Sequence, residues 1–189
     1  MSTVTAMPHT QDWTVDDLAG LPDDGFRYEL VDGVLLVSAA PVPNHQRAAR
    51  GVFRLLDDAC TPGIEVFFAP LDFQPTRRRS LEPDVLVVRT QDVGEKNVTE
   101  PLLLAVEVLS PGTRAVDLTL KRHVYEESAV PSYWLVDADV PSVTVLELGP
   151  DGRYVERATV RGDEPLTLEL PFPVTVVPST LLSRDPRRA

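Results

Sequence analysis

Two carboxylates interrupt the most apolar stretches of the chain, and their positions suggest chemistry. Asp84 directly follows Pro83 and opens one apolar stretch, and Glu107 lies near the end of another. A buried carboxylate without a partner is costly, so a chain retains one where it is paired, hydrogen-bonded or bound to a metal. Two such groups at matching ends of adjacent strands can share a divalent cation, and their oxygen atoms suit Mg²⁺ or Mn²⁺. The alternative is that Asp84 is a turn residue and that Glu107 pairs with a cation on a helix.

A third charged group is predicted to approach these carboxylates from a helix. Asp117, Lys121 and Tyr125 are spaced by four residues, so they share one face of a helix predicted over residues 114–129. From that face, the ammonium of Lys121 can project toward the strand ends and orient an attacking water or stabilise charge on a phosphate. The alternative is an Asp117–Lys121 pair on the surface, which contributes only a few tenths of a kcal/mol.

The elements that must position these residues are strands with two main helices. Both strands that carry the carboxylates are continuously apolar, which is typical of central strands covered on both faces. Apolar residues recur every three or four positions over residues 45–60, which predicts the first of the two helices. The other predicted elements are a short helix at 14–18, a hairpin of 28–31 and 34–37 around Asp32-Gly33, strands at 65–69, 71–74 and 132–137, a hairpin of 143–148 and 153–159, and an edge strand within 166–177.

This order of elements predicts an α/β or α+β layered domain with a mixed central sheet flanked by helices, an N-terminal hairpin and extra C-terminal strands. We assign one domain to residues 12–181 and flexible tails to residues 1–11 and 182–189. The composition, 43% hydrophobic and 25% charged, indicates a globular chain and argues against disorder throughout. Because no apolar run approaches the ~20 residues of a membrane span and no signal peptide is evident, we expect a cytoplasmic protein without a membrane partner.

The charge of the chain restricts how it can contact nucleic acid. The formal net charge is −11, whereas proteins that bind nucleic acid through bulk attraction are basic. Contact must therefore depend on local groups, and the candidates are His45, Arg47, Arg50, Arg54 and Arg77. The three arginines of the first helix form a stripe of the kind that contacts phosphates, and a solvated helix face is the alternative. Aromatic residues make up 6% of the chain, which we interpret as too few for a base-stacking platform.

Six short blocks of the sequence carry a resemblance to a known family. The blocks are Arg27-Tyr28-Glu29-Leu30 with Gly33, Asn44-His45-Gln46, Glu82-Pro83-Asp84-Val85, Val106-Glu107-Val108-Leu109-Ser110-Pro111, Asp117 with Lys121 and Tyr125, and Val130-Pro131-Ser132-Tyr133-Trp134-Leu135-Val136-Asp137. In this order and spacing they resemble the Uma-two family, a group of proteins similar to restriction endonucleases. The resemblance covers residues 12–150, which is most of the chain.

The resemblance implies a PD-(D/E)xK nuclease fold, in which a divalent metal is bound at the strand ends of a mixed sheet. Asp84 matches the acidic residue of the PD element and Glu107 matches the second acidic residue, so these two are the implied metal ligands. The lysine that is usual two positions later is replaced by Leu109, and Lys121 matches the position of a substitute lysine on the following helix. Glu29 matches an additional acidic residue near the site.

The function that the resemblance implies is Mg²⁺- or Mn²⁺-dependent hydrolysis of phosphodiester bonds in nucleic acid, with DNA as the expected substrate. The metal held by Asp84 and Glu107 activates a water and neutralises the phosphate. Lys121 positions the nucleophile or stabilises the developing charge, and Glu29 steers the cation or a second metal.

Other functions stay open on the sequence alone. Leu109 and the acidic net charge favour a nuclease-fold module that binds nucleic acid or protein with weak or no catalysis. Paired carboxylates also occur in sugar hydrolases, but the aromatic stripe that lines a sugar groove is missing from the sequence. Nucleases that cut both strands are often dimers, and an apolar sheet edge near residues 143–148 is a candidate surface for a homodimer.

Overall fold

A six-stranded mixed sheet forms the centre of the protein. The computed structural model describes residues 4–7 and 12–183 of the chain. The strand order of this sheet is β12-β11-β10-β9-β7-β4. Its strands are β4 (Ile64–Phe68), β7 (Val85–Arg89), β9 (Leu104–Leu109), β10 (Ser132–Asp137), β11 (Ser142–Leu148) and β12 (Tyr154–Arg161). Strands β9 and β10 pair in parallel and the other neighbours pair antiparallel, which confirms the predicted mixed sheet.

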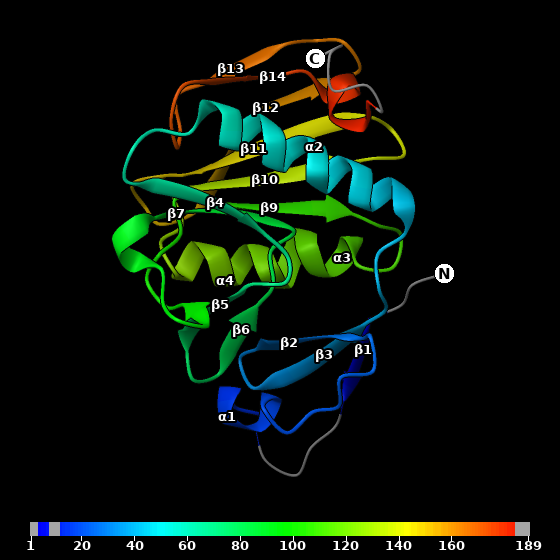
Figure 1. Ribbon diagram of the computed structural model, residues 1–189, viewed down its shortest axis with the longest axis vertical. Coiled ribbons are helices and arrows are strands. Elements are labelled where there is room, and N and C mark those ends of the chain that lie inside the picture. Colours follow the sequence, from blue (N-terminus) through cyan, green and yellow to red (C-terminus); the bar gives the residue numbers. More distant parts are fainter. Residues whose placement is uncertain (1–3, 8–11, 184–189) are drawn as a thin grey trace.

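Helices cover both faces of this sheet (Figure 1). The helical elements are α1 (Val15–Leu18), α2 (Pro43–Ala59), η1 (Thr90–Asp92), α3 (Arg114–Val116), the π-helical turn η2 (Asp117–Lys121), α4 (Arg122–Glu127) and η3 (Pro178–Leu182). In β7, Val85 and Val87 pack in a buried cluster with α2, and Leu86 and Val88 pack in another with α4. The continuous apolar character of β7 therefore reflects burial on both faces, as predicted. Within residues 12–183, no helix combines the length and the apolar character that crossing a membrane requires.

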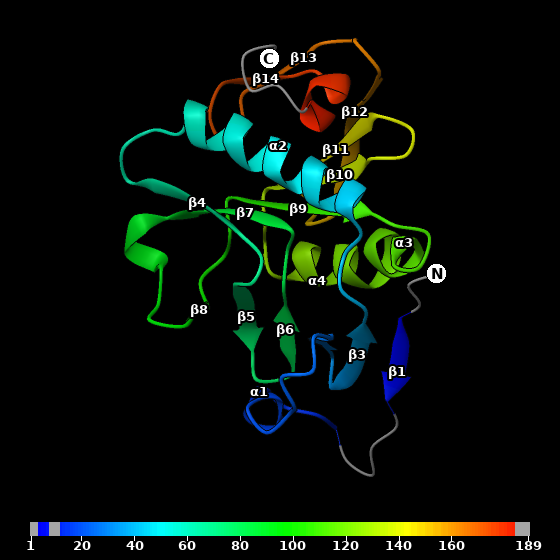
Figure 2. The same ribbon diagram turned by 45° about the vertical axis from the view of Figure 1, so that its right-hand side comes forward.

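A second six-stranded sheet packs against α4 and contains the predicted N-terminal hairpin (Figure 2). Its order is β1-β3-β2-β6-β5-β8. Its strands are β1 (Thr5–Met7), β2 (Arg27–Val31), β3 (Val34–Ser38), β5 (Asp72–Thr76), β6 (Arg79–Leu81) and β8 (Asn97–Val98). The sequence predicts the hairpin and the strand at 71–74, which corresponds to β5. It does not predict their union in one sheet, because β2 joins β6 through a pairing of Leu30 with Ser80, which are far apart along the chain.

The turn between β2 and β3 has a local cause in the sequence. Asp32 (φ 50) and Gly33 (φ 85) both adopt left-handed backbone conformations, which a tight two-residue hairpin turn requires. The resulting register pairs Glu29 with Leu36. Because side chains alternate along a strand, Arg27 and Glu29 then share one face of β2.

The C-terminal region differs from the single edge strand predicted within residues 166–177. Strands β13 (Leu166–Leu168) and β14 (Val174–Val176) pair with each other as a separate two-stranded sheet. Leu168, Val174 and Val176 are buried in the cluster that also contains the apolar face of α2. Packing against that cluster buries these side chains without extending the central sheet.

The predicted dimer edge at residues 143–148 is wrong in its location. This segment lies in β11, which is hydrogen-bonded to β10 on one side and to β12 on the other. Its backbone groups are therefore already paired, and the edges of the central sheet are β12 and β4.

The assignment of residues 12–181 to one domain stays a prediction. Within the predicted flexible tails, Thr5–Met7 is a strand paired with β3, and Leu182 ends η3. Val4 precedes this strand and Ser183 directly follows η3. The other tail residues, 1–3, 8–11 and 184–189, lie outside the described residues.

Helix α2 carries a glycine where it meets η3, and we expect Gly51→Ala to destabilise the protein. A Cβ at this position lies 2.0 Å from the backbone oxygen of Leu181, which cannot rotate away. Alanine is favoured over glycine in a helix by about 1 kcal/mol, so a net loss of about 1–3 kcal/mol in urea unfolding would report the clash. Gly20→Ala is the control, because its Cβ meets nothing closer than 3.5 Å. A Gly51→Ala protein as stable as the parent contradicts this packing.

Candidate active site

Asp84 and Glu107 are brought together by the pairing of β7 with β9. The register pairs Val85 with Val106, and continuing it by one residue places Asp84 opposite Glu107 on the same face. Both side chains are buried, with exposed fractions of 3% and 2%. The backbone N–H of Val108 donates a hydrogen bond of 2.7 Å to Oδ2 of Asp84, which ties the two strand ends together.

Lys121 reaches this pair from the π-helical turn η2. Its Nζ lies 2.8 Å from Oε1 of Glu29, 3.1 Å from Oε1 of Glu107 and 3.6 Å from Oδ1 of Asp117. Lys121 is 3% exposed, so the surface-pair alternative does not hold. Glu107 does pair with a helix cation, and it does so inside a cluster of other acids.

The helix that carries Lys121 also fixes the orientation of Glu107. The hydroxyl of Tyr125 donates a hydrogen bond of 2.8 Å to the same Oε1 atom that Lys121 contacts. Asp117 accepts a hydrogen bond of 2.8 Å from Thr113. The predicted face of Asp117, Lys121 and Tyr125 is therefore formed, and the π-helical turn within it is a feature often found at functional sites.

Strand β2 supplies two further groups, Glu29 and Arg27. Oε1 of Glu29 accepts a hydrogen bond of 3.0 Å from the backbone N–H of Glu82, just before Asp84. The guanidinium of Arg27 donates from Nη1 and Nη2 to Oδ1 of Asp84 at 3.1 and 3.2 Å. Sequence reasoning did not assign Arg27 to the site, although its position two residues before Glu29 on the same strand is a signal for it.

His45 approaches Asp84 from the first turn of α2. Its Nε2 lies 3.0 Å from Oδ2 of Asp84, and its Nδ1 is buried without a hydrogen-bond partner among the described residues. Pro43 begins this helix, which suits a first turn where the proline N–H is not needed. Asp84 is therefore held by His45, Arg27 and the backbone of Val108.

Burial and neighbouring charges act in opposite directions on Asp84. Burial raises the pKa of its carboxyl, but the hydrogen bond from His45 and the charge of Arg27 outweigh burial and lower the pKa to about 2. Asp84 is therefore an ionised carboxylate at neutral pH.

The remaining groups of the cluster show an excess of acids. Burial raises the pKa of Glu107 well above its usual value, and the like charges of Asp84 and Asp117 add to this against the opposing charge of Lys121. Burial also raises the pKa of Asp117. Burial lowers the pKa of Lys121, but the charges of Glu107 and Glu29 outweigh it and raise this pKa overall. Lys121 is thus a stable cation, and the excess of carboxylates favours a further cation.

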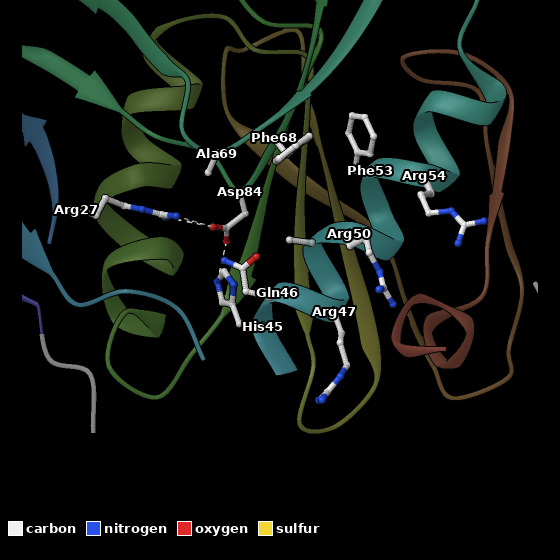
Figure 3. A pocket seen from close by; sticks show the side chains of 11 residues that line it. Arg27, His45, Gln46, Arg47, Arg50, Phe53, Arg54, Phe68, Ala69 and Asp84 are labelled. Carbon is white, nitrogen blue, oxygen red and sulfur yellow. Dashed lines mark hydrogen bonds and ion pairs between the residues drawn. The ribbon is translucent and has the colours of Figure 1, made fainter. Parts of the chain in front are cut away.

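The carboxylates line a cavity of about 360 Å³. Its lining includes five acidic residues and one lysine: Glu29, Asp84, Glu107, Asp117, Asp139 and Lys121. A second cavity of about 570 Å³ shares Arg27, His45 and Asp84 with the first and extends along α2 (Figure 3). Asp84 therefore faces both cavities.

The donor set fits an oxygen-liganded divalent cation held by two carboxylates with water in the remaining positions. Asp84 is ionised, Glu107 lies opposite it, and the surrounding excess of acids favours positive charge. Within residues 4–7 and 12–183, no group of three or more His, Cys, Asp or Glu is arranged to hold a metal. Both oxygens of Asp84 already accept N–H donors, so a cation bound there would have to displace Arg27 or His45.

The predicted substrate-contact residues divide between two places. Arg47, Arg50 and Arg54 follow one another along α2 and line the larger cavity with His45 (Figure 3). Arg77 lies in the turn between β5 and β6, is exposed, and pairs with Asp16 instead. The α2 stripe is therefore continuous with the acidic site, and Arg77 is not.

Comparison with known proteins gives a family and a fold. A family model described as "Putative restriction endonuclease" (Uma-two) matches residues 15–181. A crystal structure from Anabaena variabilis, described as "a putative nuclease belonging to DUF820", superposes with a TM-score of 0.67. The match is 18% identical and covers 89% of this chain and 97% of that one, and at this identity it shows the fold. No curated protein matches the chain significantly.

Proposed function

The chain belongs to the Uma-two family of restriction-endonuclease-like proteins, and from this premise we propose that it is a metal-dependent nuclease that hydrolyses phosphodiester bonds in nucleic acid, with DNA as substrate. One observation carries the proposal: Lys121 contacts both Glu107 and Glu29 in a buried cluster that includes Asp84. Buried clusters of charge in a cavity are typical of functional sites.

In this proposal, Asp84 and Glu107 hold Mg²⁺ or Mn²⁺ through their carboxylate oxygens. The chemistry that a bound cation supplies is a lowered pKa of its water and neutralisation of charge on the phosphate. Tyr125 holds Glu107 in place through its hydrogen bond to Oε1, so the carboxylate needs little reorganisation when substrate binds. Glu29 anchors the ammonium of Lys121 and adds negative charge beside the ligands.

In this proposal, Lys121 takes the role of the usual catalytic lysine, whose position in the sequence is occupied by Leu109. Its ammonium is buried and its pKa is raised, so it acts as a fixed positive charge and donor and not as a general base. From its position beside Glu107, it orients a water for attack or stabilises the phosphate charge that grows during cleavage.

Arg27 and His45 act on the other side of Asp84. Both donate to the Asp84 carboxylate and both line the larger cavity, so they lie where that cavity meets the acidic one. With a cation at Asp84, the Nη atoms of Arg27 would be available to a phosphate oxygen, while its Nε stays paired with Oε1 of Glu82 at 2.8 Å.

The arginines of α2 are proposed to hold the nucleic-acid backbone, and we expect Arg47→Gln and Arg54→Gln each to weaken binding. Each lost phosphate contact should reduce the slope of log affinity against log salt concentration by about 0.7–0.9. Fluorescence anisotropy with a labelled oligonucleotide over a range of salt concentrations measures this slope. Arg77→Gln is the matched control, because Arg77 pairs with Asp16 away from both cavities. An equal effect of all three changes contradicts a path along α2.

The test of the proposed activity is cleavage of single- and double-stranded DNA and RNA with Mg²⁺, Mn²⁺ or a chelator. We expect strand cleavage with Mg²⁺ or Mn²⁺ and none with the chelator. Calorimetry on the same protein should report one divalent cation bound, and Asp84→Asn should abolish that binding. Absence of cleavage for every substrate and metal contradicts the proposal.

A nuclease-fold binding module is the second candidate, and one observation favours it. Both oxygens of Asp84 are engaged by Arg27, His45 and the N–H of Val108, an arrangement that satisfies the carboxylate without a metal. This candidate predicts nucleic-acid binding that is unchanged by a chelator and no turnover. For either candidate we propose the cytoplasm as the compartment, where the free thiol of Cys60 is compatible with a reducing environment.

A further inference from the structure

An exposed aromatic ring lies beside the candidate active site. Phe68 ends β4 and is 58% exposed, which is unusual for a residue of its size. The pairing of β4 with β7 sets Phe68 opposite Val85, and the N–H of Ala69 donates a hydrogen bond of 3.3 Å to the backbone oxygen of Asp84. The ring is therefore positioned by the same sheet that positions the catalytic carboxylates.

A second ring supports the first. Phe53 of α2 meets Phe68 edge to face, with ring centroids 4.9 Å apart and an interplanar angle of 73°. In this arrangement the edge of one ring packs on the face of the other, and Phe68 keeps more than half of its surface open. Both rings line the cavity of about 570 Å³, and Figure 3 shows them next to each other above Arg50 and Arg47, with Asp84 on the side of Phe68.

The charges around these rings favour an anion. Arg47 and Arg54 line the cavity and have no hydrogen bond or ion pair within residues 12–183, and Arg50 donates only to the backbone oxygen of Ser183 at 3.3 Å. Uncompensated guanidinium groups on a strongly acidic protein are a local exception, because the net charge of the chain is −11. The cavity therefore combines an open aromatic face with cations, at the edge of a site for phosphodiester chemistry.

We propose that this cavity holds an unpaired nucleobase stacked on Phe68, with the adjoining phosphates on the arginines of α2, so that the preferred substrate is single-stranded or locally unpaired nucleic acid. The inference rests on the proposed nuclease function and deepens it. A base inside a duplex has both of its faces covered by neighbouring bases, whereas an unpaired base offers a face to an aromatic side chain. The size of the cavity lies within the range of sites for small ligands.

Stacking has a consequence for specificity. Every base presents a π-face, so Phe68 accepts all four bases, and the cavity reads the strandedness of the substrate more than its sequence. The interpretation from composition, that 6% aromatic residues are too few for stacking, does not apply here, because one exposed ring at the right place is sufficient.

The test is binding of matched oligonucleotides in the presence of a chelator and at low salt, so that no turnover contributes. Wild-type protein should bind single strands more tightly than the corresponding duplex. Phe68→Ala and Phe68→Leu should weaken single-strand binding roughly 5- to 100-fold, while Phe68→Tyr, which keeps the ring, should bind like wild type. Val155→Ala, which removes an equally exposed apolar group at the opposite edge of the sheet, is the control and should change nothing.

A direct readout comes from Phe68→Trp, whose emission should be quenched by an oligonucleotide with bases and not by one with an abasic residue at the bound position. DNA and RNA strands of one sequence distinguish the two sources of a stacking base, and tighter binding of either supports the proposal. Equal affinity for single strand and duplex, or full affinity of Phe68→Leu, overturns it. Because the assay contains no metal, loss of the stacking effect is distinguishable from failure of the nuclease proposal, which would appear as absent cleavage with an intact Phe68 effect.

Discussion

Replacing Asp84 by asparagine or Glu107 by glutamine is expected to lower metal-dependent cleavage roughly 10²- to 10³-fold or more. Each change keeps the shape of the side chain and removes a negative charge that the proposed cation requires. Asp84 is the proposed ligand that is ionised, with a pKa of about 2, and Glu107 lies opposite it across the β7–β9 pair. The measurement is the initial rate of phosphodiester cleavage at saturating Mg²⁺ or Mn²⁺.

The matched control for this prediction is Asp92→Asn. Asp92 lies in η1, just beyond the far end of β7, and pairs with Arg89, so it is close to the strand but away from the site. Both variants and the control should remain folded by circular dichroism. Equal cleavage rates for Asp84→Asn, the control and the wild type would assign any activity to a contaminant or to other residues.

Replacing Lys121 by methionine is expected to destabilise the protein by about 3–5 kcal/mol at neutral pH. The change keeps the length and apolar stem of the side chain and removes the ammonium that neutralises Glu29 and Glu107. Removing one partner of a buried charge pair leaves the others uncompensated, which costs far more than losing a surface pair. Urea unfolding at pH 8 measures the loss.

The loss should depend on pH in a definite direction. The pKa values of Glu107 and Asp117 are raised in the folded protein by burial and like charges, and loss of Lys121 raises them further. A carboxyl whose folded pKa is raised favours folding most below its unfolded pKa, and that stability is lost as the pH rises toward the folded pKa. The deficit of Lys121→Met relative to the wild type should therefore shrink between pH 8 and pH ~4.5.

The chain offers a control for the lysine change as well. Lys96 is the other lysine of the sequence, is exposed, and has no ion pair within residues 12–183. Lys96→Met should alter stability little at any pH. A Lys121→Met protein as stable as Lys96→Met would mean that the buried acids find other compensation, and it would weaken the role of Lys121 in holding the site together.

The acidic part of the candidate site could be predicted because charged residues interrupt otherwise apolar stretches of the sequence. Asp84 and Glu107 stand out as charges within apolar strands, and Lys121 stands out through its spacing from Asp117 and Tyr125 on one helix face. These signals are readable within a few residues, and the elements that carry them formed as predicted. The hairpin turn at Asp32 and Gly33 belongs to the same class, because its conformation depends on two adjacent residues.

The rest of the site depends on contacts between distant parts of the chain. Arg27 joins Asp84 only because β2 pairs with β6 in a second sheet, and no local pattern specifies that pairing. The exposure of Phe68 could not be predicted from the sequence either, because an apolar residue at the end of a strand is usually expected to be buried in the core. Arg77 is the opposite case: the sequence makes it a candidate for contact with nucleic acid, whereas the turn between β5 and β6 places it beside Asp16.

The opposition of Asp84 and Glu107 has a consequence for how the site tolerates change. Directly opposed residues on an antiparallel pair have Cβ atoms about 4.5–5.5 Å apart, a spacing that comes from the peptide group and its hydrogen bonds. Strand pairing therefore sets the distance between the two acids, and this distance does not depend on the length of the segment 90–103 that connects the two strands. Chain can be added or removed in that connection over evolutionary time without altering the gap that the proposed shared ion would span. A one-residue slip of either strand, in contrast, would turn one of the acids to the other face of the sheet, and the two carboxylates would no longer lie opposite each other.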